Sequence, residues 1–311
     1  MRLDDLPDSG NIEDRRGDGG FGGGGGFGLP IGGGGLGVGT IVVLGIIGWA
    51  MGIDPSLLIG GAEILSGSHQ QTQAPPTARR TSKPQDEMGR FVDRVLGSTE
   101  ARWRDVFAQD GKTYRPPILV LYRGQTYAGC GEAQSVMGPF YCPLDQKVYL
   151  DTSFFDEIAR RFHGCDVGSK SCQFSEAYVI AHEVGHHVQN LLGILPKAQQ
   201  AQRVANSRAE ANHIQVQVEL QADCLAGVWA NQQNEYLKSH GRAPFIEPGD
   251  VETALRTAAA IGDDTLQRRA RGYAVPDSFT HGSAEQRQHW FSAGFRSGSV
   301  RSCNTFASAQ L

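Results

Sequence analysis

Apolar residues occur in regular patterns only in the C-terminal part of the chain, from about residue 87 onward. Seven apolar residues recur at helical spacing and predict a first helix: Phe91, Val92, Val95, Leu96, Trp103, Val106 and Phe107. The short apolar runs ILVLY at Ile118–Tyr122 and QKVYLD at Gln146–Asp151 predict two buried strands. The first packed elements are therefore one helix and a small sheet.

The rest of the pattern is helical. Ser153, with Asp156 three residues on, predicts the N-terminal cap of a helix that Gly164 ends. The later helices are expected at Ser175–Leu192, Pro196–Arg208, Ala211–Ser239, Val251–Ile261 and Ser283–Phe295. The pattern predicts one domain over residues 87–311, of the α+β class, mostly helical with a small β-sheet.

The N-terminal part has a different composition. Residues 1–35 show no apolar periodicity, and 15 of the 41 glycines fall between Gly17 and Gly39. Such a backbone loses too much entropy on folding to order itself, so we expect a disordered Gly-rich tail. No charge occurs from Gly19 to Ile53, which predicts one transmembrane helix over residues 36–58. Residues 59–86 contain a stretch rich in Ser, Gln, Pro and Thr, which predicts a linker.

Two other interpretations of the apolar run are a secretory signal peptide and a buried soluble helix. The run begins late for a signal peptide and follows a segment in which carboxylates outnumber arginines. Its glycines would make a poor helix in water. Basic residues lie on both sides of the run, so charge does not decide its orientation.

The chain has six cysteines: Cys130, Cys142, Cys165, Cys172, Cys224 and Cys303. An even number, with two pairs close in sequence, favours three disulfides over six buried thiols. The pairing that we expect is 130–142, 165–172 and 224–303, although the sequence alone allows others. Disulfides place a domain in an oxidising compartment, so we expect a cell-membrane protein with this domain outside the cytoplasm.

The stretch AHEVGHHVQN, Ala181–Asn190, carries the pattern H-E-x-x-H. On a helix, His182 and His186 share one face, opposite to an apolar stripe that faces the core. Glu183 lies beside that row, where a carboxylate reaches a metal-bound water without binding the metal. His187 leaves the row, and we interpret it as a packing residue.

A metal that activates water needs a third protein ligand. The stretch VELQADCLAGVWA, Val218–Ala230, places Glu219 and Asp223 four residues apart on one helix face. Glu219 is our candidate for the third ligand. Asp223 is our candidate for the carboxylate that accepts a hydrogen bond from a ligating histidine. A solvated acidic pair is the alternative interpretation.

A di-iron centre is the rival metal site. Two E-x-x-H motifs, at Glu183–His186 and Glu210–His213, resemble the ligand pairs of helix-bundle di-iron proteins. That scheme leaves His182, Glu219 and Asp223 without a role. The zinc scheme uses all three, and we favour it.

Together, AHEVGHHVQ and ELQADCLAGVWA resemble the zincin metallopeptidases that use a glutamate as third zinc ligand. The chain is similar to a family of membrane-anchored bacterial neutral zinc metallopeptidases. NIEDRRG near the N-terminus, GPFYCPLDQKVYLD and FTHGSAEQR carry the same similarity, which spans nearly the whole chain. The resemblance implies a zincin-like fold, Zn²⁺ bound by His182, His186 and Glu219, and Glu183 as the base.

The expected activity is hydrolysis of peptide bonds with a zinc-activated water and Glu183 as general base. A peptide or protein substrate would lie extended against an edge strand of the sheet, for which Gln146–Asp151 is the candidate. A formal net charge of −4 gives no reason to expect nucleic acid as a partner. Two alternatives stay open: a zinc-stabilised scaffold without turnover, and a hydrolase of a non-peptide amide.

His281 precedes the helix that Ser283 caps, with Gln286 three residues on. Loop–helix junctions often carry functional side chains on a rigid support. We expect His281 to donate a hydrogen bond to the developing oxyanion, with Arg287 holding the loop or pairing with an acidic neighbour. A surface histidine at a helix start is the alternative.

Overall fold

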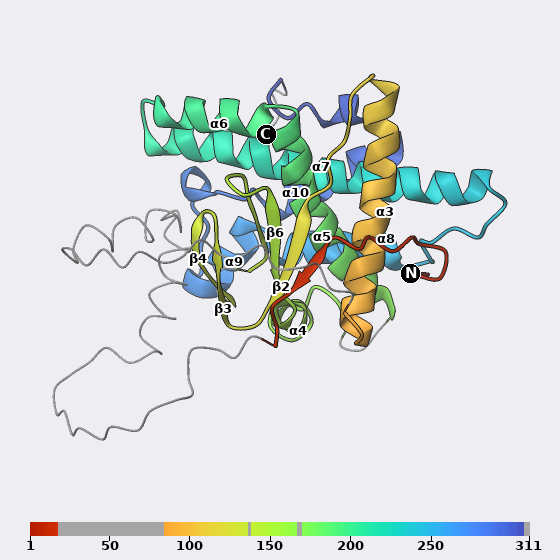
Figure 1. The fold of residues 1–311 in the computed structure, drawn as a ribbon. Helices are drawn as coiled ribbons and strands as arrows, with labels where there is room; N and C mark the ends of the chain where they lie inside the picture. Colours follow the sequence, from red (N-terminus) through yellow and green to blue (C-terminus); the bar gives the residue numbers. More distant parts are fainter. Residues whose placement is uncertain (18–83, 136–137, 167–169, 308–311) are drawn as a thin grey trace, which may run out of the picture.

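A computed structural model describes residues 1–17, 84–135, 138–166 and 170–307. Over these residues the fold is α+β and mostly helical, with a small sheet, as the sequence pattern predicted (Figure 1). The helices are α3 (Glu87–Gln109), α4 (Ser153–Arg160), α5 (Lys170–Leu191), α6 (Ile194–Arg203), α7 (Arg208–Ser239), α8 (Asp250–Ala260), α9 (Asp263–Arg271) and α10 (Ala284–Ser297). Two short 3-10 helices, η2 (Pro276–Ser278) and η3 (Val300–Cys303), precede and follow α10.

The main sheet has the strand order β1-β2-β6-β5. Its strands are β1 (Ile12–Asp14), β2 (Ile118–Tyr122), β6 (Lys147–Asp151) and β5 (Phe140–Cys142). β1, β2 and β6 run parallel, and β5 pairs antiparallel with β6. The predicted strand Gln146–Asp151 is therefore interior to the sheet. The expectation that it offers an edge to a substrate is wrong, because β5 lies outside it.

Alternation along the strands gives the sheet two buried faces. Leu119 and Leu121 of β2 belong to the main core with the helices, together with Val148 and Leu150 of β6. The intervening Val120, Tyr122 and Tyr149 form a smaller core with the hairpin β3–β4 (Gln125–Ala128 and Gly131–Gln134). This explains why ILVLY reads as a continuous apolar run rather than an alternating one.

The three predicted disulfides are all present. Cys130–Cys142 ties the turn of the hairpin to β5, with a Cα–Cα distance of 5.8 Å. Cys165–Cys172 joins the loop before α5 to the first turn of that helix, and Cys224–Cys303 joins α7 to η3. The three bridges therefore hold loops or turns against the edge strand β5, helix α5 and helix α7, respectively.

Two local predictions about helix ends had different outcomes. Ser283 caps α10 through a capping box with Gln286, as predicted. Ser153 is not a cap but the first residue of α4, and its N–H donates to Oδ1 of Asp151 at 2.9 Å. The N-cap position is Thr152, one residue earlier than predicted, and its side chain makes no capping hydrogen bond.

Part of the predicted disordered tail, residues 1–17, belongs to the fold. Leu6 and Ile12 are buried in the main core, and β1 pairs with β2. A strand of three residues in a polar segment has too few positions to show a period, which is why the sequence pattern did not predict it. The hairpin β3–β4, β5 and α9 were missed as well, since each is short.

The predicted transmembrane helix over residues 36–58 and nearly all of the predicted linker 59–86 lie outside the described residues. Among the residues that the structure does describe, none of the helices has the length and apolar character needed to span a bilayer.

The N-terminal segment and α3 touch at Gly97. A Cβ on Gly97 would overlap the backbone of Pro7 and Asp8. Alanine stabilises a helix relative to glycine by about 1 kcal/mol, so an isolated α3 would gain from the change. Here the added methyl group has to displace the backbone of the N-terminal segment. This steric cost outweighs the gain in helix propensity, so the net effect on the free energy of unfolding is destabilising.

We therefore expect Gly97→Ala to lower the free energy of unfolding by about 1–3 kcal/mol, measured by urea denaturation. Gly17→Ala is the matched control, because nothing lies within 4 Å of its added methyl. It should change stability by less than about 0.5 kcal/mol. A more stable Gly97→Ala protein would contradict the packing of residues 1–17 on α3.

Candidate metal centre

The candidate site lies where α5 and α7 cross. Gly185 of α5 faces Ala222 of α7, and a Cβ on Gly185 would lie 3.1 Å from the carbonyl oxygen of Ala222. The missing side chain lets the two backbones approach closely. The close approach brings one histidine of α5 on each side of Gly185 within reach of the carboxylates on α7.

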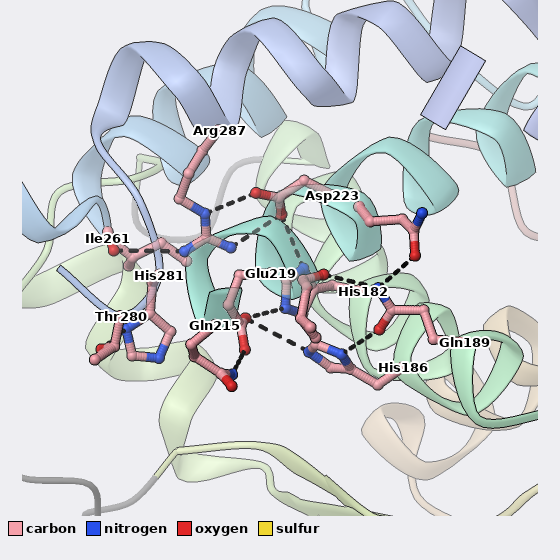
Figure 2. A network of polar contacts seen from close by, with 12 residues as sticks. His182, His186, Gln189, Gln215, Glu219, Asp223, Ile261, Thr280, His281 and Arg287 are labelled. Atoms are coloured by element: carbon pink, nitrogen blue, oxygen red, sulfur yellow. Dashed lines mark hydrogen bonds and ion pairs between the residues drawn. The ribbon is translucent and has the colours of Figure 1, made fainter. Parts of the chain in front are cut away.

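Three potential ligand atoms converge at this crossing. Oε2 of Glu219 lies 3.2 Å from Nε2 of His182 and 3.5 Å from Nε2 of His186. The donor atoms of the three residues all lie within 4.8 Å of one another (Figure 2). Their side chains are only 9–12 % exposed. Two imidazoles and one carboxylate in a nearly buried cluster suit a divalent cation better than an isolated ion pair.

The outer ring nitrogens of both histidines are already engaged. Nδ1 of His182 donates to Oδ1 of Asp223 at 2.8 Å, and Nδ1 of His186 donates to Oε1 of Gln189 at 2.9 Å. The amide group of Gln189 donates in turn to the carbonyl oxygen of Val218 at 2.8 Å, which fixes its orientation. These partners keep a proton on Nδ1 of each ring, so Nε2 is the nitrogen that faces the cluster and can bind a metal once its own proton has left.

Asp223 is the centre of a buried network behind His182. Its carboxylate also accepts a hydrogen bond from the hydroxyl of Tyr178 at 2.5 Å. Nε and Nη2 of Arg287 donate to it as well, each at 2.9 Å (Figure 2). Burial raises the pKa of Asp223, but the charges of Arg287 and His182 lower it to about 2. The carboxylate is therefore ionised, and Arg287 pairs with it rather than with the loop that carries His281.

The charges of the cluster are strongly coupled. Burial lowers the pKa of His182, but the Asp223 carboxylate raises it, to about 10. Burial raises the pKa of Glu219, yet the charge of His186 and the hydrogen bond from His182 hold it well below its usual value. A cation bound here would compete with protons for both Nε2 atoms, so its binding releases protons.

Glu183 is buried beside the cluster, 7 % exposed. Burial raises the pKa of its carboxyl group, and the charges of His182 and His186 partly oppose that shift. A carboxylate with a raised pKa next to two imidazoles is suited to accept a proton near neutral pH.

His281 lies on the other side of Glu219 from His186 (Figure 2). Its side chain is 33 % exposed, and its charge contributes to lowering the pKa of Glu219. Oδ2 of Asp263, at the start of α9, accepts hydrogen bonds from the backbone N–H groups of Thr280, His281 and Gly282 at 2.6–3.0 Å. Asp263 thus holds the loop, a task that the sequence reasoning had offered to Arg287.

His187 packs away from the cluster. Its Nε2 donates to the carbonyl oxygen of Arg115 at 2.7 Å, and its Nδ1 lies 3.1 Å from the hydroxyl of Tyr141 in β5. The same hydroxyl accepts a hydrogen bond from Asn190. These contacts attach the edge strand β5 to α5.

The rival di-iron scheme finds no support in the geometry. Glu210 and His213 are exposed at the start of α7, where Glu210 bonds to Asn206. Neither belongs to the group of side chains placed to hold a metal.

Sequence reasoning missed several residues that orient the site. Tyr178 and Gln189 lie four residues before His182 and three residues after His186, so helical spacing could have identified them. Gln215, which donates to Oε1 of Glu219 at 2.8 Å, lies four residues before that glutamate on α7. Asp263 carried no such signal, because it reaches the loop from a different helix.

Comparison with known proteins decides the family. A model of the family described as "Putative neutral zinc metallopeptidase" matches residues 1–306. The chain belongs to this family. The protein YpfJ of Escherichia coli K12, whose printed description is "Uncharacterized protein", is 45% identical over 306 residues, 98% of this chain and 99% of the relative. Rv2575 of Mycobacterium tuberculosis H37Rv, described in the same way, is 41% identical over 269 residues, 84% of this chain and 85% of the relative. No solved structure matches the chain.

Membership in this family implies Zn²⁺, and the residues present fit it. His182, His186 and Glu219 form a group placed to hold a metal ion, with the donor set that zinc accepts. The position of Glu219 in this group agrees with the sequence argument for a third ligand one long helix away.

We expect the purified protein to contain about one zinc per chain, and His186→Ala to contain much less, because two remaining donors bind weakly. Elemental analysis by mass spectrometry measures both. His213→Ala is the matched control, since this histidine is exposed and lies outside the group. Two irons per chain, or loss of metal in the control, would contradict the assignment.

Proposed function

We propose that this protein is a zinc metallopeptidase with a zincin-like arrangement, in which His182, His186 and Glu219 hold the metal. The observation that carries the proposal is the position of Glu183. It is buried, its pKa is raised, and it follows the first ligand directly on the same rigid helix. A structural zinc site has no use for a carboxylate that lies beside its ligands without binding the metal.

A zinc ion held by His182, His186 and Glu219 would activate a water molecule and polarise the carbonyl group that is attacked. Glu183 accepts the proton of the attacking water and passes it to the leaving amine. Asp223 and Gln189 keep His182 and His186 in the tautomers that present Nε2. His281, positioned by Asp263, donates to the oxygen that becomes negative in the transition state.

The edge strand β5 supports the choice of an extended peptide as substrate. β5 lies at one end of the main sheet, packs against α5, and is attached to it through the hydroxyl of Tyr141. Backbone groups on the outer side of an edge strand can pair with an extended chain. A peptide paired with β5 would run alongside the helix that carries His182 and Glu183.

We also propose that the domain works outside the cytoplasm, anchored through the apolar segment at residues 36–58. The three disulfides support an oxidising compartment, because reducing conditions would keep these thiols free.

A comparison of protein N-termini, across the proteome, between cells carrying the wild type and cells carrying Glu183→Gln tests the proposed activity. Peptide hydrolysis predicts new N-termini that appear only with the wild type. Their absence would favour the two alternatives, a zinc-stabilised scaffold or a hydrolase of a non-peptide amide, over a peptidase.

On a peptide substrate identified in this way, we expect Glu183→Gln to keep zinc and stability but lower kcat by at least about 100-fold, because only the proton acceptor is removed. Glu210→Gln, at an exposed position, is the control and should retain wild-type kcat. Steady-state kinetics and metal analysis of both proteins provide the measurements. Turnover of Glu183→Gln at the wild-type rate would refute the mechanism.

We expect His281→Ala to bind zinc and fold normally, and to turn over at least about tenfold more slowly, because a donor to the developing negative charge is lost. The effect should fall on kcat rather than on KM. His289→Ala, an exposed histidine on α10, serves as the comparison. Unchanged kcat in His281→Ala would leave this histidine with a structural role only.

A further inference from the structure

Two strands that lie on opposite sides of the apolar segment in the sequence are neighbours in the sheet. Ile12–Asp14 pairs in parallel with Leu119–Leu121. At the two ends of the pair, the N–H of Leu119 donates to the carbonyl of Asn11 at 2.9 Å, and the N–H of Arg15 donates to the carbonyl of Leu121 at 2.7 Å. Strands paired in this way lie about 4.8 Å apart, so they belong to one folded body.

Side chains of α3 hold the same N-terminal segment. Oδ1 of Asp93 accepts a hydrogen bond from the N–H of Gly10 at 3.0 Å, and Oε1 of Glu100 accepts one from the side chain of Asn11 at 2.8 Å. Asp93 and Glu100 are both buried. The segment is therefore attached through its backbone, its polar side chains and its apolar side chains to elements that follow the apolar run.

The chain also leaves and re-enters this body at one place. Arg16, the next-to-last described residue of the N-terminal segment, makes two hydrogen bonds to Asp86, the third described residue after the gap, at 3.0 and 2.5 Å. Oδ1 of Asp86 also accepts from the N–H of Gly89 and so caps α3. The Arg16–Asp86 ion pair fixes the exit and the return of the chain side by side.

From this geometry we infer that residues 1–17 and 84–307 lie on the same side of any membrane with which the protein associates. A single crossing between Gly17 and Pro84 would separate β1 from β2 by a hydrocarbon core of about 30 Å. It would also separate Arg16 from Asp86. The single-pass arrangement expected from the apolar run is thus incompatible with the sheet. Membrane association through residues 36–58 has to begin and end on the side where the domain lies.

Cysteine accessibility in whole cells tests this inference on the full chain. Because the six native cysteines are all paired, Asp4→Cys and Leu144→Cys each introduce one free thiol, at a fully exposed side chain and at a residue that is 78% exposed. A membrane-impermeant maleimide should label both in intact cells, or both only after permeabilisation. Labelling of one in intact cells and of the other only after permeabilisation would overturn the inference.

A charge exchange provides a second measurement that does not depend on labelling. Arg16→Asp and Asp86→Arg should each lower the Tm of the full-length protein, the first also because Arg16 pairs with Asp14 and the second also because Asp86 caps α3. If the two residues meet, the double variant should lose less than the sum of the two single losses. Arg90→Asp is the control for a charge change at an exposed position of α3. Losses that simply add in the double variant would count against the side-by-side exit and return.

Discussion

The arrangement of the site depends on one buried carboxylate, Asp223. It receives hydrogen bonds from α5, through Tyr178 and His182, and from α10, through Arg287. Removing these charges from water costs several kcal/mol for each ion, so the carboxylate is tolerable only with its partners in place. Tyr178, His182 and Arg287 therefore have to stay within hydrogen-bonding distance of Asp223. This requirement constrains the relative placement of α5, α7 and α10.

The same requirement explains why α5 can carry two imidazoles in edge-to-face contact. His182 and His186 would repel each other as cations, and Glu219 and Asp223 supply the compensating negative charge. Glu219 contacts the two rings from the side of the cluster, while Asp223 contacts His182 from behind. The two acids thus have separate tasks although they lie on one helix face only one turn apart.

The helix positions of the ligands could be predicted because the relevant distances are local in sequence. Four-residue spacing put His182 beside His186, and Glu219 above Asp223, without knowledge of the fold. That the two helices cross at Gly185 and Ala222 could not be predicted, since it depends on packing between distant segments. For the same reason β1 and Asp263 were missed: each acts on a partner that lies elsewhere in the chain. The interior position of β6 could not be predicted either, because the sequence of one strand does not determine which strands pair on its two sides.

The Arg16–Asp86 ion pair turns the segment between these residues into a closed loop of the folded protein. The entropy lost on closing a flexible loop grows only with the logarithm of its length, so doubling the length costs about 0.6 kcal/mol. Lengthening or shortening the Gly-rich tract thus changes the stability of the domain very little. The length of the tract can therefore differ from one member of the family to another while the metal centre stays the same.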